Sequence, residues 1–115
     1  MIKLKTLPLK EVIINDAFWN KYINLVPDVI IPYQWDILND RVEGAEPSYC
    51  ISNFRIAAKE QDGEFRGAVF QDTDLAKWLE AVAYSLEWNP DEKLEKLADE
   101  VIDLIGKAQD ETGYL

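Results

Sequence analysis

The feature that most restricts the fold is a pair of helix-patterned segments separated by only a few residues. Residues 73–86 carry apolar side chains on one face of a helix, at Leu75, Leu79, Val82 and Leu86. Residues 90–108 are apolar on one side and charged on the other. A connection this short predicts an antiparallel helical hairpin. Because Trp78 and Ala81 widen the apolar side of the first helix, we expect this helix to be buried between neighbouring helices.

Capping signals predict where the later helices begin. Asn89 is a candidate cap, with Pro90 at the first helical position and Glu92 three residues after the cap. The inner face of that helix is then formed by Leu94, Leu97, Ala98, Val101, Ile105 and Ala108. Ser52 is a candidate cap for a short helix with three inward residues, Phe54, Ala57 and Ala58.

The first half of the chain is predicted to be helical but interrupted. Asn15 or Asp16 is expected to cap a helix from about Ala17. Proline lacks the N–H that a helix interior uses, so we expect a disturbance near Pro27 and a second helical segment from Pro32 to Leu38. Polar, glycine-containing residues 39–50 and 62–70 are predicted loops, and residues 7–15 a short strand or an extended arm.

Composition excludes several classes of function. The formal net charge of −10 argues against binding nucleic acid or an anionic membrane surface, whereas a neutral ligand such as a sugar is compatible with it. The chain has no histidine and one cysteine, Cys50, which excludes an internal disulfide and a Ser-His-Asp or Cys-His site within it. No signal peptide or membrane-length apolar run is apparent, so a cytoplasmic location is the expectation.

Three stretches in order along the chain carry a more specific signal. They read "IPYQWDILND" (31–40), "GAVFQDTDLAKWLEAVAYSL" (67–86) and "AQDETGYL" (108–115). Together they resemble the N-terminal part of glycoside hydrolase family 127, whose characterised members include β-L-arabinofuranosidases. The resemblance runs from about "INDAFW" (14–19) to the last residue, with similar spacing.

The resemblance implies a mainly α fold, in which helical hairpins form part of an (α/α)6 barrel after a short N-terminal strand or extended arm. Residues 1–115 are then a single N-terminal fragment of an α/α-barrel catalytic domain. Family members are several times longer, and their barrel is followed by β-sandwich domains.

The family's catalytic groups are a cysteine nucleophile in a zinc site and an acid/base glutamate. All of them lie beyond the motif that ends this sequence, and Cys50 matches none of them. The resemblance therefore assigns no catalytic residue and no metal ligand here, and zinc belongs only to the full-length family. We expect a part of a glycoside hydrolase that acts on L-arabinofuranosides or related glycans and is inactive as this isolated chain.

Two acidic residues, Asp72 and Asp74, open the central helix, and two interpretations remain open. Acids in a first turn are favoured by the helix dipole, so both residues serve as a helix start. In an α/α barrel the N-terminal ends of inner helices face the pocket, so both also suit sugar hydroxyls. They do not form an acid/base pair, because residues two apart on a helix point in nearly opposite directions.

Gln34 and Trp35 form the second candidate pair. An amide both donates and accepts hydrogen bonds, which suits a sugar hydroxyl, and an indole face stacks on a sugar ring. Capping of the backbone by Gln34 is an equally good interpretation, and core packing is the better one for Trp35. The candidate substrate-binding residues are therefore Gln34, Trp35, Asp72 and Asp74.

Two other functions stay open at the level of sequence. The chain is alternatively a helical protein-interaction module that self-associates, because the exposed apolar helix faces of an incomplete barrel favour a homodimer. An intact small hydrolase that uses carboxylates alone is disfavoured, because no catalytic pair is evident.

Overall fold

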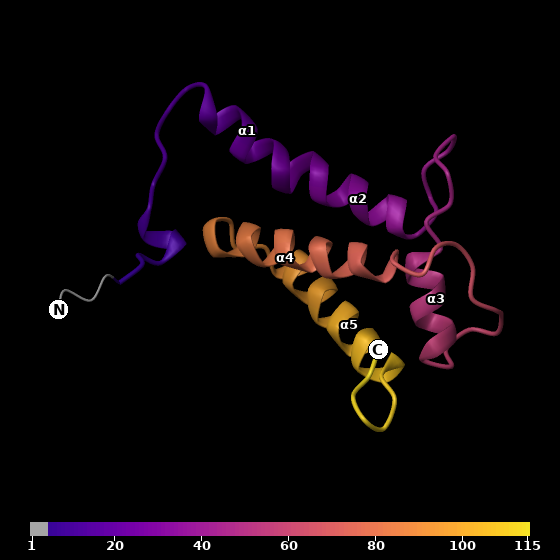
Figure 1. Cartoon of the computed structure of the whole chain (residues 1–115). Helices are drawn as coiled ribbons and strands as arrows, with labels where there is room; N and C mark the ends of the chain where they lie inside the picture. Colours follow the sequence, from indigo (N-terminus) through magenta and orange to yellow (C-terminus); the bar gives the residue numbers. More distant parts are fainter. Residues whose placement is uncertain (1–4) are drawn as a thin grey trace.

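A computed structural model describes residues 5–115 and is helical throughout its ordered elements (Figure 1). The elements are η1 (Leu9–Glu11), α1 (Trp19–Leu25), η2 (Val26–Ile30), α2 (Ile31–Leu38), α3 (Cys50–Ala57), α4 (Asp72–Trp88) and α5 (Glu92–Ala108). No strand forms among the described residues, so the N-terminal segment is the extended arm, interrupted by the 3-10 turn η1. Between residues 5 and 115, no helix is long and apolar enough to cross a membrane.

The elements α1, η2 and α2 form one continuous rod (residues 19–38), because the helix widens at Pro27 instead of breaking. Asp16 caps the start, where its carboxylate accepts hydrogen bonds from the backbone N–H groups of Phe18 and Trp19. At η2 the bonding changes to π-helical, with the Ile31 N–H reaching the carbonyl of Val26. The disturbance expected near Pro27 is therefore confirmed, and its form is a π-helical turn that leaves α1 and α2 joined (Figure 1).

The predicted hairpin is formed by α4 and α5, which are joined by residues 89–91 and run in opposite directions (Figure 1). Its first helix buries three of the expected residues, Leu75, Trp78 and Val82. The cap of α5 differs from the prediction. Asp91, and not Asn89, accepts hydrogen bonds from the backbone N–H groups of Lys93 and Leu94, because the helix begins at Glu92.

The short helix α3 also begins earlier than its sequence signal. Its first residue is Cys50, after Tyr49 in a left-handed conformation (φ 55°). Ser52 is not the N-cap: it lies inside the first turn, and its hydroxyl donates to the Tyr49 carbonyl. Phe54 is buried as expected, but Ala57 is exposed at the edge of the helix face that Cys50, Ile51 and Phe54 bury.

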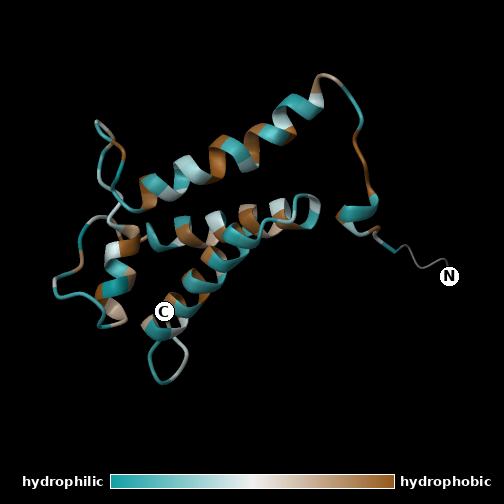
Figure 2. Cartoon of the chain, turned by 180° about the vertical axis from the view of Figure 1, so that it is seen from behind, coloured by the Kyte–Doolittle hydropathy of each residue, from teal (hydrophilic) through white to brown (hydrophobic). Residues whose placement is uncertain are grey.

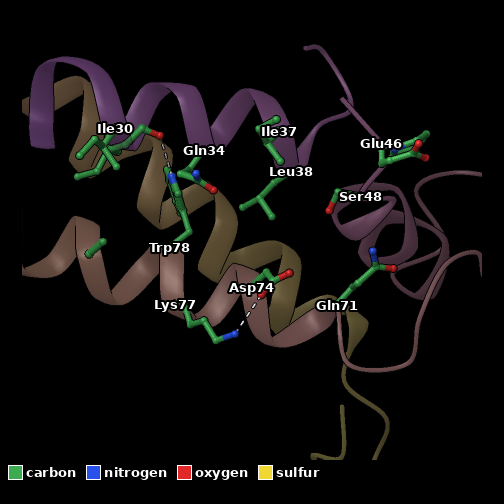
Figure 3. Close-up of a pocket in the computed structure, with 13 residues that line it drawn as sticks. Ile30, Gln34, Ile37, Leu38, Glu46, Ser48, Gln71, Asp74, Lys77 and Trp78 are labelled. Carbon is green, nitrogen blue, oxygen red and sulfur yellow. Dashed lines mark hydrogen bonds and ion pairs between the residues drawn. The ribbon is translucent and has the colours of Figure 1, made fainter. Parts of the chain in front are cut away.

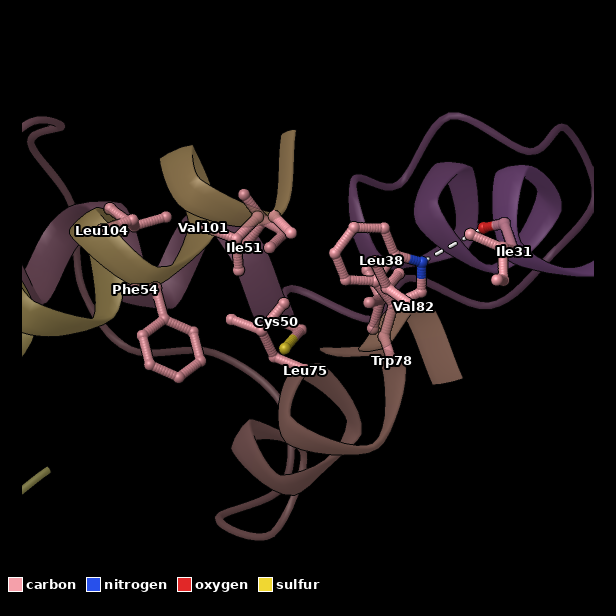
Figure 4. Close-up of a cluster of buried hydrophobic side chains, with 11 residues drawn as sticks. Ile31, Leu38, Cys50, Ile51, Phe54, Leu75, Trp78, Val82, Val101 and Leu104 are labelled. Atoms are coloured by element: carbon pink, nitrogen blue, oxygen red, sulfur yellow. Dashed lines mark hydrogen bonds between the residues drawn. The ribbon is translucent and has the colours of Figure 1, made fainter. Parts of the chain in front are cut away.

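A single core joins the rod, α3 and the hairpin (Figure 4). Its buried members are Ile31, Leu38, Cys50, Ile51, Phe54, Leu75, Trp78, Val82, Ala98, Val101 and Leu104. Trp78 links two layers, because its indole N–H donates to the Ile31 carbonyl at 3.1 Å and its ring packs on that of Trp35, with centroids 4.7 Å apart. The core therefore fixes α4 under the rod.

The molecule is less compact than a globular domain of the same length. Its radius of gyration is 17.1 Å, against about 13 Å for a compact domain of this size. It exposes 9235 Å², against about 6400 Å² for a folded monomer of this mass. Apolar stretches on the N-terminal arm and the rod lie outside the core (Figure 2). The largest exposed apolar side chains there include Ile13, Phe18, Trp19, Tyr22 and Val29.

Candidate functional site

A cavity of about 460 Å³ lies between the rod and the N-terminal half of α4 (Figure 3). The rod supplies one wall, α4 supplies the floor, and the loop 39–49 closes one end. The lining residues are Ile30, Ile31, Gln34, Ile37, Leu38, Glu46, Pro47, Ser48, Gln71, Asp74, Lys77, Trp78 and Ala81. This is a mainly apolar hollow with several polar groups at its rim, as expected of a small-molecule site.

Gln34 extends from α2 toward α4 across this cavity (Figure 3). It is exposed, and its side chain makes no hydrogen bond to any residue between 5 and 115. Capping of the backbone, the alternative interpretation of this residue, is therefore not its role in the described part of the chain. Its amide is free to donate to and accept from a ligand.

Asp74 lies on the floor of the cavity, in the first turn of α4. Its carboxylate is 3.1 Å from the ammonium of Lys77, which also lines the cavity, and both side chains remain substantially exposed (Figure 3). A solvent-exposed pair of this kind contributes little to stability. The pair places an acceptor and a donor beside each other at the rim.

Two residues that the sequence reasoning did not single out complete the polar rim. Gln71 precedes α4, and its side-chain oxygen accepts from the backbone N–H of Ala68 at 2.7 Å, which leaves its NH₂ group as a donor. Ser48 is buried at the end of the loop 39–49. Gln71 was detectable, since it adjoins Asp72 at the same helix start, whereas no local pattern marks Ser48.

The other two candidate residues lie outside the cavity. Asp72 is exposed at the first residue of α4, and its carboxylate accepts from the adjacent N–H of Thr73 at 2.9 Å. Trp35 is half-buried against Trp78, which agrees with its core interpretation. The structure thus brings together Gln34 and Asp74 but neither Trp35 nor Asp72, and a role of these two in substrate binding stays a prediction.

The described residues provide neither a reactive thiol nor a metal site. Burial raises the pKa of the Cys50 thiol to about 11; a hydrogen bond with the Leu75 backbone opposes this shift, and the charges of Asp74, Asp72 and Asp40 add to it. A thiol of this kind is a poor nucleophile at neutral pH. No group of three or more His, Cys, Asp or Glu side chains that suits a metal ion occurs within residues 5–115, so these residues do not fit the zinc that the family resemblance implies.

Comparison with known protein families shows the family to which this chain belongs. The family model for the β-L-arabinofuranosidase GH127 catalytic domain matches residues 11–115. The chain belongs to glycoside hydrolase family 127. This GH127 chain is 40% identical over 117 residues to the non-reducing end β-L-arabinofuranosidase of Bifidobacterium longum subsp. longum, a match that covers 91% of the chain and 18% of the relative.

Solved GH127 structures share its fold. A GH127 β-L-arabinofuranosidase from Geobacillus stearothermophilus T6 superposes with a TM-score of 0.85 at 63% identity, covering 88% of this chain and 16% of that one. A GH127 β-arabinofuranosidase superposes with a TM-score of 0.79 at 32% identity, covering 94% of this chain and 16% of that one. The expected fold, mainly α and part of an (α/α)6 barrel, is confirmed. The chain spans less than a fifth of these relatives' length.

Proposed function

We propose that this GH127 chain is the N-terminal part of a glycoside hydrolase that acts on L-arabinofuranosides or related glycans, and that it supplies one wall of the sugar-binding pocket. The observation that carries the proposal is the mainly apolar cavity between α2 and α4, which Gln34 lines from α2 and Asp74 lines from α4. Amide and carboxylate groups of this kind bind sugar hydroxyls, and Trp78 gives the floor an aromatic edge.

In this proposal the chain binds substrate but performs no chemistry alone. Glycoside hydrolysis, whether retaining or inverting, uses two groups that flank the scissile bond. The only thiol within residues 5–115, Cys50, is buried and protonated, and the carboxylate of Asp74 has a lysine as its near neighbour. The reacting groups, and the zinc that the resemblance implies, therefore belong to the remainder of the complete enzyme.

The relatives named β-L-arabinofuranosidase support the sugar class. One of them, at 63% identity, has this helical unit in nearly the same arrangement. The openness of the isolated chain supports its membership of a larger domain, because a unit that folds alone does not leave this much apolar side-chain surface in water. The same surface also suits the alternative, a self-associating interaction module.

The test is kinetic and uses the complete enzyme with an aryl β-L-arabinofuranoside. Gln34→Ala and Asp74→Ala are each expected to raise KM by roughly three- to tenfold, the range for the loss of one ordinary hydrogen bond to a ligand. Glu80→Ala, on the exposed side of α4, is the matched control and leaves KM unchanged. Unchanged KM in both cavity variants would contradict the proposed pocket.

Asp72→Ala, measured in the same assay, separates the two interpretations of that residue. Because Asp72 lies outside the cavity and bonds to its own helix start, we expect no change in KM. A rise equal to that of Asp74→Ala would instead assign Asp72 to the pocket.

A further inference from the structure

The end of α2 has an unusual residue at its turning point. The Asp40 N–H bonds to the Ile37 carbonyl and the Arg41 N–H to the Asp36 carbonyl, the paired bonds of a Schellman helix end. In this motif the residue after the cap adopts a left-handed conformation and is usually glycine. Here it is Asp40, with φ of 57°. Asp40 therefore adopts a backbone conformation that is unfavourable for most residues other than glycine.

Asp40 lies at the start of the loop 39–49, and its carboxylate reaches the far end of that loop. One of its oxygens accepts from the Ser48 N–H at 2.6 Å and from the Tyr49 N–H at 3.1 Å, and the other lies 3.2 Å from the same Tyr49 N–H. Charge-assisted bonds to backbone N–H groups are stronger than neutral ones. Asp40 thus fastens the end of the loop to the end of α2.

The chain contains its own comparison for this geometry. The helix α3 ends in the same way: the Lys59 N–H bonds to the Ile56 carbonyl, the Glu60 N–H bonds to the Arg55 carbonyl, and Lys59 has φ of 60°. Within the described residues, the Lys59 side chain has no hydrogen-bond or ion-pair partner. The left-handed turn therefore forms without a side-chain anchor, and the bonds of Asp40 are an addition to it.

The fastened segment is the part of the loop that lines the cavity. The end wall of the cavity is formed by Glu46, Pro47 and Ser48, of which Ser48 bonds directly to Asp40. Figure 3 shows Glu46 and Ser48 at the same end of the cavity as Gln71. Asp40 itself does not line the cavity. Its effect on a ligand is transmitted through the backbone position of residues 46–48.

We propose that Asp40 is a positioning residue for substrate binding: it fixes residues 46–48 as the end wall of the sugar pocket. This inference rests on the proposed function of the cavity. The loop has no helix or strand of its own, so its backbone depends on such anchors. Loss of the anchor leaves the helix end intact and allows the wall to move.

The experiment uses the complete enzyme and three variants. Asp40→Gly retains the left-handed turn but removes the anchor, and we expect KM to rise roughly three- to tenfold while kcat changes less than twofold. Asp40→Asn keeps one acceptor oxygen and is expected to fall between Asp40→Gly and the unmodified enzyme. Lys59→Gly makes the same backbone change at α3 and leaves both constants unchanged.

Hydrogen exchange gives a second readout that does not depend on activity. In Asp40→Gly, the amides of Ser48 and Tyr49 are expected to exchange faster, whereas those of α4 are unchanged. A purely structural role would instead lower the melting temperature with KM unaffected. Unchanged KM in Asp40→Gly, or unchanged exchange at residues 48 and 49, would overturn the proposal.

The variants of Gln34 and Asp74 separate this failure from that of the pocket itself. If they raise KM and Asp40→Gly does not, only the positioning role is refuted. If none of the three raises KM, the cavity is not the sugar site, and both proposals fall. If Asp40→Gly does not fold, the KM and exchange of Asp40→Asn decide the question.

Discussion

At the scale of single residues, Trp78 shows how one side chain joins core and site. Its indole N–H donates to the Ile31 carbonyl of the rod, its ring packs on that of Trp35, and it lines the cavity. The helical spacing predicted that Trp78 is buried. The partner of its N–H lies 47 positions away in the sequence, so no local pattern identified that bond.

Replacement of Trp78 by phenylalanine is expected to lower the free energy of unfolding by about 1–3 kcal/mol. The variant loses the bond to Ile31 and leaves a small void, while the Ile31 carbonyl retains its place in the helix. Urea unfolding of the 115-residue chain, followed by circular dichroism, measures the difference. A midpoint equal to that of the unmodified chain would show that the bond contributes nothing.

Cys50 is expected to be inert in the folded chain. Its pKa of about 11 leaves almost no thiolate at neutral pH, and its side chain is buried. Iodoacetamide should therefore label Cys50 only after unfolding in urea. Rapid labelling of the folded chain would contradict both the burial and the absence of a catalytic role.

The same shift in the pKa of Cys50 predicts a pH dependence of stability. The thiol has an ordinary pKa of 9.0 in the unfolded chain and about 11 in the folded chain. Between these values the unfolded chain has lost the proton that the folded chain keeps, so rising pH favours unfolding. The contribution is complete below about pH 9 and is lost as the pH approaches 11. Cys50→Ala should lack this part of the decline in urea titrations across that range.

At the scale of elements, the sequence was informative about which segments are helical and less so about where they begin. The hairpin, the interruption at Pro27 and the loops follow from spacing and proline chemistry, which are local. The helix α3 begins three residues before its predicted start, and α5 begins two residues after its predicted start. Several capping residues compete at each start, and tertiary packing of the apolar face selects among them.

The competition at α5 is testable by substitution. Asp91→Ala is expected to lower the free energy of unfolding by about 1 kcal/mol, because it leaves the N–H groups of Lys93 and Leu94 without their acceptor. Asn89→Ala is the matched control and should lower the free energy of unfolding by less, since the Asn89 side chain makes no hydrogen bond in the described part of the chain. The opposite order in urea midpoints would restore Asn89 as the cap.

The candidate site was also predictable only in part, because local sequence patterns do not specify tertiary contacts. Gln34 was predicted from an amide that suits a sugar hydroxyl, and Asp74 from a helix start expected to face a pocket; both line the cavity. The loop 39–49 supplies three further lining residues, Glu46, Pro47 and Ser48. The path of this loop is set by the hydrogen bonds of Asp40 and by long-range contacts. The direction of an irregular loop is not encoded in a short pattern.

At the scale of the whole molecule, the apolar side chains outside the core are the dominant feature. The rod carries an aromatic cluster of Phe18, Trp19 and Tyr22 in water, with ring centroids 5.0–6.3 Å apart. Patches of this kind mark contacts with other protein surfaces. In our proposal they are covered by the remainder of the catalytic domain.

Without that remainder, the isolated chain is expected to self-associate. Sedimentation velocity over a concentration series should show species larger than the 13.2 kDa monomer. The double variant Phe18→Ser and Tyr22→Ser should shift the distribution toward monomer, because it removes apolar area from the rod without entering the core. A chain that stays monomeric at every concentration would contradict this expectation.

The most direct test of the central claim is an assay of the isolated 115-residue chain beside the complete enzyme on the same β-L-arabinofuranoside. The claim is that this chain provides pocket surface while the reacting groups lie elsewhere in the domain. It predicts hydrolysis by the complete enzyme and none above background by the chain, at any pH or zinc concentration tested. Turnover by the chain alone, abolished by Asp74→Ala, would contradict it.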